Sequence, residues 1–311
     1  MRERYYSFNQ YLQKKFGQRV QRISIDAGFG CPNLDGTFSQ KGCIYCNNKG
    51  FGVYAESHKP IEEQITESID FYKRRIGAEK FILYFQSFSN THADAKILRQ
   101  KYDIIKRFSQ IVGLFISTRP DCIDEEKLKL IADYKKNYLV WIEYGVQTTH
   151  DYLLDLLNRN HTYKDFLVTL DLTRKYGIDV GIHLILGLPS ATEKEMIQDA
   201  ERISCLDIQG VKFHVLHVLR GTALEEMYNK GALELLTERK YVKIICDFLE
   251  RIPQHFVILR LISDAPPDYL IAPLWINDKN KVLNEIKKEF QNRKTHQGYY
   301  LTKLKSKDTS L

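Results

Sequence analysis

The 311-residue chain has no apolar run long enough to cross a membrane as a helix. One of its longest apolar runs, residues 181–189 (GIHLILGLP), is only the size of a strand. The basic first 17 residues contain no apolar segment of the kind found in secretory signals. Linkers rich in Pro, Gly or Ser are also missing, as are internal repeats. These absences predict a cytoplasmic protein without a membrane partner, and one large folded unit of ordinary composition.

Cysteine is scarce, with six residues in the chain, yet three of them lie within sixteen positions: Cys31, Cys43 and Cys46. The other three are scattered, which suggests neither a disulfide framework nor a second metal centre: Cys122, Cys205 and Cys246. A structural zinc site takes four protein ligands, and no fourth Cys or well-spaced His is near. A four-iron cluster held by three thiolates keeps one iron open for another ligand. Three cysteines that fall together by chance, or an incomplete zinc knuckle, are the alternatives.

Apolar periodicity indicates an alternation of strands and helices along the whole chain. The expected strands cover residues 22–26, 80–85, 112–117, 139–145, 178–185, 211–216 and 256–261. The expected helices cover residues 7–17, 60–71, 93–109, 124–136, 149–157, 162–176, 192–204, 222–230, 237–251 and 279–293. Strands separated by helices pair in parallel through right-handed crossovers. The pattern therefore predicts an α/β fold, either an open doubly wound sheet or a barrel.

Positive charge gathers near both ends of the chain, whose formal net charge is +7. Residues 279–307 hold nine Lys or Arg against two acids, interleaved with aromatic residues. A second basic stretch has only Glu3 opposing it: Arg2, Arg4, Lys14, Lys15, Arg19 and Arg22. Such stretches can neutralise phosphates and so favour a nucleic-acid partner, although a solvated helix face and tail explain them equally well.

Polar residues follow the expected strands where the carboxyl ends of a barrel place functional groups. The polar segments are QSFSNT at 86–91, STRPD at 117–121, EYGVQT at 143–148 and NRNH at 158–161. The apolar strand HLILGLP at 183–189 contributes His183. Each segment alone has an ordinary structural explanation, for example a buried Gln that satisfies backbone groups. Their order behind a three-cysteine loop is specific.

The loop spacing, Cys-x11-Cys-x2-Cys with Tyr45 before the last Cys, resembles the cluster loop of radical S-adenosylmethionine (SAM) enzymes. It is a longer variant of their usual Cys-x3-Cys-x2-Cys, as in the branch of Elp3 and coproporphyrinogen dehydrogenase. The resemblance implies a [4Fe-4S] cluster on Cys31, Cys43 and Cys46, with SAM on the fourth iron. It implies a partial (β/α)6, TIM-like barrel with an N-terminal helix and a C-terminal strand/helix extension. It divides the chain into a helical extension (1–20), a barrel with the cluster loop 31–46 (21–235) and a C-terminal extension with a basic tail (236–311).

The resemblance also places SAM contacts on residues of this chain. The segment 86–91 stands where the family usually has Gly-Gly-Glu, a departure that leaves the contact residues there open. The implied SAM-binding set is Tyr45, Gln86, Ser87, Ser117, Thr118, Glu143, Gln147, Arg159 and His183.

At both ends of the chain, motifs such as YLQKKFG at 11–17 and LIAPLW at 270–275 resemble a short Elp3-related bacterial family that includes MnmL-type proteins. That resemblance implies a tRNA enzyme. Its expected reaction converts 5-carboxymethylaminomethyl(-2-thio)uridine at wobble position 34 to 5-aminomethyl(-2-thio)uridine through a 5′-deoxyadenosyl radical, with flavodoxin or ferredoxin as reductant. The alternatives are another RNA site or a small molecule as substrate, or a non-catalytic zinc-containing RNA-binding protein.

A substrate carboxylate inside a barrel needs a cation, preferably an Arg that pairs with both oxygens. The candidates for this and for proton transfer are Arg260, Arg220, Lys212, His214, His217 and Asp264. Ordinary ion pairing, such as Arg260 with Asp264, is the alternative for each of them. The sequence leaves the oligomeric state open.

Overall fold

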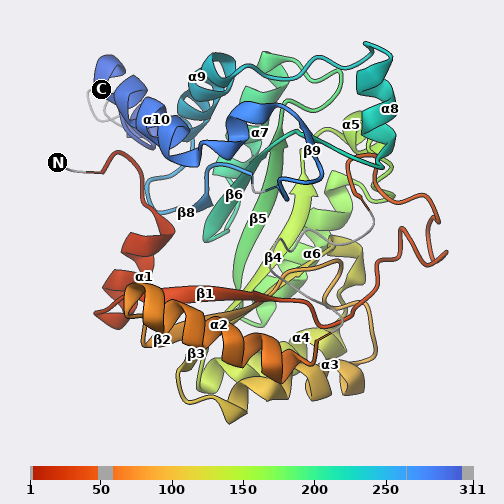
Figure 1. Ribbon diagram of the computed structural model, residues 1–311, viewed down its shortest axis with the longest axis vertical. Helices are drawn as coiled ribbons and strands as arrows, with labels where there is room; N and C mark the ends of the chain where they lie inside the picture. The colour runs from red at the N-terminus through yellow and green to blue at the C-terminus, as the bar shows by residue number, and fades with distance from the viewer. Residues whose placement is uncertain (1–2, 48–58, 264, 303–311) are drawn as a thin grey trace, which may run out of the picture.

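The computed structural model describes residues 3–47, 59–263 and 265–302. Its centre is a seven-stranded sheet in the order β1-β2-β3-β4-β5-β6-β8, in which all neighbouring strands are parallel. The strands are β1 Val20–Ile25, β2 Lys80–Phe85, β3 Ile111–Thr118, β4 Leu139–Gln147, β5 Asp179–Leu186, β6 Gly210–Val215 and β8 Val257–Arg260. The sheet curls, so that β1 and β6 run in very different directions (Figure 1). The predicted partial TIM-like barrel is confirmed.

Helices connect the strands and lie outside the curled sheet (Figure 1). The α-helices are α1 Phe8–Phe16, α2 Ile61–Ile76, α3 Ala95–Tyr102, α4 Glu125–Asp133, α5 Asp151–Leu156, α6 Tyr163–Lys175, α7 Glu193–Ser204, α8 Ala223–Asn229, α9 Glu238–Leu249 and α10 Lys279–Arg293. Short 3-10 turns are η1 Asp103–Arg107, η2 Pro120–Cys122, η3 Tyr134–Lys136 and η4 Leu274–Asn277. None of the helices described is both long and apolar enough to span a bilayer.

The strands are apolar because both faces of this sheet are covered. All nine residues of β4 are buried, as are five of the six residues of β2. A parallel sheet with helices on one face and filled space on the other requires such continuous apolar strands. This is why the sequence pattern located the strands well.

Helix α1 fills the amino-terminal end of the curled sheet. Its first turn is capped by Ser7, whose Oγ accepts a hydrogen bond from the Gln10 amide. The ring of Tyr11 meets that of Trp141 edge-on with centroids 5.5 Å apart, and Trp141 stacks on Phe115 at 5.4 Å. These rings form one buried cluster with Leu12 and other apolar side chains of β1, β2, β4 and β8. The helix therefore closes one end of the barrel.

The carboxy-terminal region adds strand β8 to the edge of the main sheet beside β6. It also supplies β9 Leu270–Ala272, which pairs antiparallel with β7 Val218–Leu219 in a second, two-stranded sheet. The sequence analysis did not predict β7 or β9, because two or three residues are too short to show a period. The division into regions 1–20, 21–235 and 236–311 stays a prediction.

Many charges of the two basic stretches have partners within the protein. In α10, Lys281 pairs with Glu238 at 2.8 Å and Arg293 with Asp247 at 2.6 Å. Arg22 points into the barrel, where its Nη1 lies 3.6 Å from a Glu143 oxygen. The basic residues after 302 lie outside the described part of the chain. A nucleic-acid surface at these stretches stays a prediction.

We expect Gly210→Ala to destabilise the protein by about 1–3 kcal/mol. A Cβ at this position would lie 2.7 Å from the Val257 carbonyl oxygen and 3.0 Å from the Trp141 ring, so β6, β8 or the ring must shift. Gly30→Ala is the matched control, since its Cβ would meet nothing closer than 3.7 Å. Urea unfolding of both variants measures the effect. Equal free energies of unfolding for Gly210→Ala and the parent would contradict the packing described here.

Candidate active site

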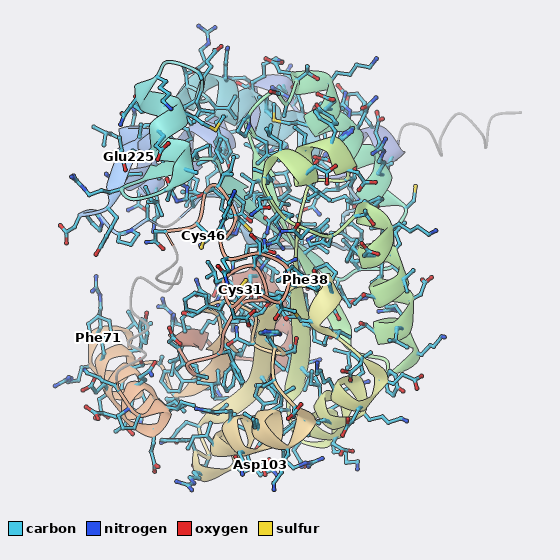
Figure 2. All side chains as sticks on the ribbon, turned by 90° about the vertical axis from the view of Figure 1, so that its right-hand side faces the viewer. Cys31, Phe38, Cys46, Phe71, Asp103 and Glu225 are labelled. Carbon is cyan, nitrogen blue, oxygen red and sulfur yellow. The ribbon has the colours of Figure 1, made fainter. Side chains whose placement is uncertain are left out.

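The cysteine loop lies at the carboxyl ends of the strands, directly after β1. Figure 2 shows Cys31 and Cys46 near the middle of this face, between α8, which carries Glu225, and α2, which carries Phe71. Cys43 is buried, whereas Cys31 and Cys46 are half-buried. Backbone turns shape the loop, since the Leu34 amide donates to the Cys31 carbonyl and the Cys46 amide to the Cys43 carbonyl. All three cysteines line one cavity at this end of the barrel.

Two asparagines after α5 hold this loop in place. The Asn158 Nδ2 donates to the Gly42 carbonyl at 2.6 Å, and the Asn158 carbonyl accepts from Asn33 Nδ2 at 2.5 Å. Asn160 Nδ2 donates to Asn33 Oδ1 at 3.1 Å. Both asparagines adopt positive φ, 55° and 54°, a conformation that Asn tolerates better than most residues. We call residues 158–160 the asparagine clamp.

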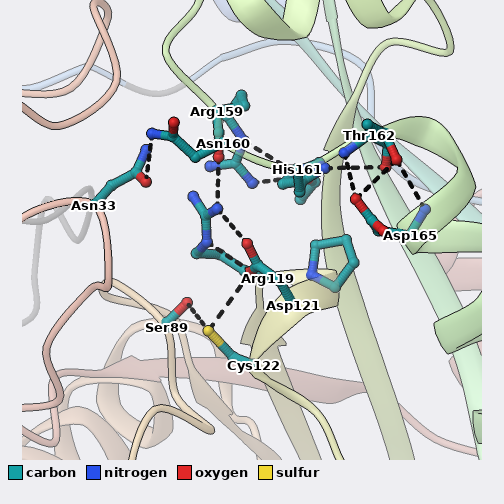
Figure 3. Close-up of polar contacts among 12 residues, drawn as sticks. Asn33, Ser89, Arg119, Asp121, Cys122, Arg159, Asn160, His161, Thr162 and Asp165 are labelled. Carbon is teal, nitrogen blue, oxygen red and sulfur yellow. Dashed lines mark hydrogen bonds and ion pairs between the residues drawn. The ribbon is translucent and has the colours of Figure 1, made fainter. Parts of the chain in front are cut away.

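Arg159 lies between the two asparagines in the sequence, and its side chain reaches the thiol of Cys43. Its Nη1 lies 3.5 Å from Cys43 Sγ, its Nη2 donates to the Gly145 carbonyl at 2.7 Å, and its Nε contacts His161 Nε2 at 3.2 Å. Figure 3 shows the contact between Arg159 and His161 and, beside it, Arg119, whose Nη2 donates to the Arg159 carbonyl. Gly145 permits the close approach, because a Cβ there would lie 3.2 Å from Arg159 Nη2.

Electrostatics favour a thiolate at Cys43. Burial raises the pKa of this thiol, but the guanidinium groups of Arg159 and Arg119 and the Asn33 amide outweigh burial, so the net pKa falls. Burial dominates at Cys31, and the pKa of that thiol is raised. The thiolate is the form that binds iron, so Cys43 is better prepared than Cys31 to bind it.

A cavity of about 1060 Å³, part of it open to solvent, extends from the thiols into the barrel. Twelve of the expected site residues line it: Cys31, Cys43, Tyr45, Cys46, Gln86, Ser117, Thr118, Gln147, Arg159, His183, Lys212 and His214. His217 lines it as well. Among the described residues, six besides glycine have positive φ, and two of these, Phe88 and Gln147, lie on its wall. Strained backbone of this kind gathers at functional sites.

The donor set fits a four-iron cluster better than a single ion. The described part of the chain gathers no three His, Cys, Asp or Glu side chains closely enough to ligate one metal ion. Three thiolates of a four-iron cluster bind three different iron atoms and stand farther apart. The cavity beside them, with its buried Arg159, has room and charge for an anionic ligand on the remaining iron. The arrangement therefore fits a [4Fe-4S] cluster with bound SAM, held by Cys31, Cys43 and Cys46.

The floor of the cavity rests on a buried carboxylate, Glu143. Its Oε2 accepts hydrogen bonds from Tyr84 Oη at 2.8 Å and Lys212 Nζ at 3.1 Å, and lies 2.7 Å from His183 Nε2. Burial raises the pKa of Glu143, but Lys212, His183 and Arg22 more than offset it and hold the pKa well below its usual range. Glu143 itself has no exposed surface and does not line the cavity. Its place is that of a counter-ion beneath His183 and Lys212.

Arg260 stands behind His214 at the same floor. Its Nη2 lies 2.6 and 2.9 Å from the two ring nitrogens of His214, whose ring centroid is 5.4 Å from that of His183. Burial, with Arg260 and His183 nearby, holds the pKa of His214 well below its usual range. Burial also lowers the pKa of His183, to about 4, and Lys212 adds to this effect. Both imidazoles are therefore neutral near pH 7.

Three further expected residues are not among those described on the cavity wall. Ser87 is buried but not on the wall, Arg220 is exposed, and Asp264 lies outside the described residues. Reasoning from the sequence missed Phe88, Ser89 and Arg119, which do line the cavity. The sequence could have indicated Arg119, because it belongs to the segment 117–121. Only the first two residues of that segment were predicted to contact SAM.

We expect Asn158→Ala and Asn158→Gly both to bind less iron on reconstitution, because each removes the side-chain bonds to Gly42 and Ser39. Ala adds a backbone strain of about 1–2 kcal/mol at φ 55°, which Gly avoids. Iron and sulfide analysis per chain measures the effect. Asn137→Ala, at an exposed position after η3, is the control and should bind iron normally. Full iron content in the Gly variant would show that the clamp works through backbone conformation alone.

Comparisons with known proteins identify the family to which the chain belongs. The Radical SAM superfamily model matches residues 35–203 and the Radical_SAM C-terminal domain model matches residues 208–292. The uncharacterized protein YtqA of Bacillus subtilis (strain 168) is 37% identical over 306 residues, covering 97% of this chain and 94% of the relative. The tRNA uridine(34) acetyltransferase of Dehalococcoides mccartyi (strain CBDB1) is 30% identical over 52% of this chain and 36% of its own length.

The fold also matches that of a solved relative. Elp3 of the archaeon Methanocaldococcus infernus superposes with a TM-score of 0.67 at 18% identity, over 89% of this chain and 64% of that one. Members of the superfamily bind a [4Fe-4S] cluster and SAM, the groups that the three thiols and the adjoining cavity fit. The chain thus belongs to the radical SAM superfamily and is related to its Elp3 branch.

Proposed function

We propose that this protein is a tRNA-modifying radical SAM enzyme. Its reaction converts 5-carboxymethylaminomethyl(-2-thio)uridine at wobble position 34 to the 5-aminomethyl form. The observation that carries the proposal is a cavity with thiols at one end and a cationic floor at the other, made by Lys212 with Arg260 behind His214. The sequence resemblance to MnmL-type proteins and the similarity to a tRNA uridine(34) acetyltransferase support a wobble uridine as substrate.

The cluster and SAM, when bound, supply a 5′-deoxyadenosyl radical that takes one hydrogen atom from the substrate. The hydrogen is taken from the methylene between the nitrogen and the carboxylate, because an unpaired electron on that carbon is delocalised toward both groups. Loss of a second electron, which the cluster would take back, and of the N–H proton would leave a C=N bond that water would hydrolyse. The balance is SAM, carboxymethylaminomethyluridine and water giving methionine, 5′-deoxyadenosine, aminomethyluridine, glyoxylate and one proton.

The residues of the floor suit this substrate. Lys212 uses two of its three N–H donors on Tyr84 and Glu143, which leaves one for a substrate carboxylate. Burial lowers the pKa of Lys212 and the Glu143 carboxylate opposes that shift, as a bound carboxylate would. The neutral imidazoles of His183 and His214 can accept a hydrogen bond from the water that attacks the imine.

The reaction itself is tested with anaerobically reconstituted protein, SAM, dithionite and tRNA bearing carboxymethylaminomethyluridine. We expect aminomethyluridine, 5′-deoxyadenosine and glyoxylate in equal amounts by mass spectrometry. Cys43→Ala should abolish all three products, whereas Cys205→Ala, at an exposed residue after α7, should keep them.

Other results of this assay would change the proposal. Deoxyadenosine without altered tRNA discards the substrate but keeps the enzyme class, and aminomethyluridine without glyoxylate discards the hydrolysis. A colourless protein with stoichiometric zinc and no iron would overturn the enzyme assignment and favour a zinc-containing RNA-binding protein.

Arg260→Lys should raise the KM for tRNA roughly 10-fold and change substrate-free SAM cleavage little. Lysine keeps the charge but cannot keep the planar contact with both ring nitrogens of His214, so the floor loses one charge-assisted bond. Arg220→Lys is the matched control, because the exposed Arg220 is not on the cavity wall. Steady-state kinetics separates the two readouts. An equal loss of tRNA turnover and uncoupled cleavage would rule out a role limited to substrate.

A further inference from the structure

Arg119 is a buried cation at the thiol end of the cavity. It follows β3 directly, and its side chain is 4% exposed. It lines the cavity on the side of the thiols, and its charge acts to lower the pKa values of both Cys31 and Cys43. The ring of Phe38, from the cysteine loop, lies 5.9 Å from its guanidinium carbon. A guanidinium in such a place is expensive to bury unless its donors are satisfied.

Two of its three nitrogens are satisfied. Nε donates to Asp121 Oδ1 at 2.8 Å, and Nη2 donates to Asp121 Oδ2 and to the Arg159 carbonyl, each at 2.5 Å. Figure 3 shows this fork and shows that the third nitrogen points away from Asp121, toward the side on which Asn33 of the cysteine loop lies. The paired carboxylate therefore fixes the plane and the direction of the guanidinium.

The third nitrogen, Nη1, is buried and has no hydrogen-bond partner among the described residues. Leaving a buried donor of a charged group unsatisfied is unfavourable, and native proteins rarely show it. A purely structural ion pair with Asp121 accounts for Nε and Nη2 but gives no reason for Nη1. A hydrogen-bond acceptor that binds together with the cofactors would explain the unpaired Nη1.

The position of Nη1 limits what that acceptor can be. Arg119 adjoins the thiols rather than Lys212 and Glu143, so the acceptor belongs to the cluster end of the cavity. The groups that the site takes at that end are anionic: the sulfides of a thiolate-bound cluster, and the carboxylate of SAM on its open iron. Both are strong acceptors for a guanidinium N–H.

We propose that Arg119 is an anion-binding residue of the loaded site, whose Nη1 donates a hydrogen bond to the SAM carboxylate or to a cluster sulfide. Asp121 is a positioning residue that acts through Arg119. The proposal rests on the cluster and SAM and not on the tRNA substrate, so it stands or falls independently of the proposed reaction.

Two measurements on reconstituted, full-length protein test it, and neither needs turnover. The first is the Kd of SAM for the oxidised cluster protein by anaerobic equilibrium dialysis. The second is the reduction potential of the SAM-free cluster by EPR-monitored titration. The variants are Arg119→Met and Arg119→Lys, compared at full occupancy of four iron atoms per chain, so that a general loss of stability does not enter either readout.

If the carboxylate is the acceptor, Arg119→Met raises the Kd of SAM roughly 10- to 100-fold, with Arg119→Lys in between, and Arg119→Lys, which keeps the charge, has the SAM-free potential of the parent. If a sulfide is the acceptor, Arg119→Met lowers the SAM-free potential, because the more negative reduced cluster loses a nearby cation, and Arg119→Lys restores most of it. Unchanged Kd and potential in both variants would overturn the proposal.

Two further variants protect the test. Arg119→Met leaves Asp121 as an unpaired carboxylate, which could impair folding. The double variant Arg119→Met/Asp121→Asn removes that charge. It should show the same change in Kd or potential as Arg119→Met. Arg174→Met is the matched control, since Arg174 also pairs with an aspartate, Asp207, and has a buried Nε without a hydrogen bond, but lies at the far end of α6. An equal shift in the Arg174 variant would assign the effect to general electrostatics.

Discussion

The ionised carboxylate of Glu143 ties the inside of the barrel together. It lies on β4 and contacts Arg22 of β1, Tyr84 of β2, His183 of β5 and Lys212 of β6. A charge with no exposed surface is tolerable only with such partners, and each partner is held in turn by the same carboxylate. The register of five strands is therefore coupled to one side chain, and the floor of the cavity is set by it.

The cavity built on this floor has cations at both ends. Arg119 and Arg159 stand by the thiols, and Lys212 stands at the floor, with Arg260 behind His214. Glu143 and Asp121 are buried or nearly so and face these cations, leaving a surplus of positive charge toward the space between. Anionic groups stabilise such a site: a thiolate-bound cluster at one end, a SAM carboxylate beside it and a substrate carboxylate at the other.

Sequence reasoning succeeded where one local pattern determines the structure. Buried strands such as β2 show as continuous apolar runs, and the loop from Cys31 to Cys46 shows as a spacing. It failed where a residue's role depends on a distant partner. Arg22 was counted with a surface stretch because charged residues are mostly exposed, yet its partner is 121 positions away on β4. Glu143 was predicted to contact SAM, whereas the curled sheet buries its side chain beneath the cavity.

Burial and the cations of the floor together fix the proton state of its histidines. Lys212 and Arg260 disfavour a second positive charge nearby, so His183 and His214 stay neutral at physiological pH. Because His183 Nε2 faces the ionised Glu143, the proton of the neutral ring belongs on Nε2, and Nδ1 is the nitrogen left as an acceptor. A carboxylate buried for structural reasons thereby selects the tautomer of a histidine on the cavity wall. Catalytic chemistry at this floor and the stability of the barrel consequently depend on one group.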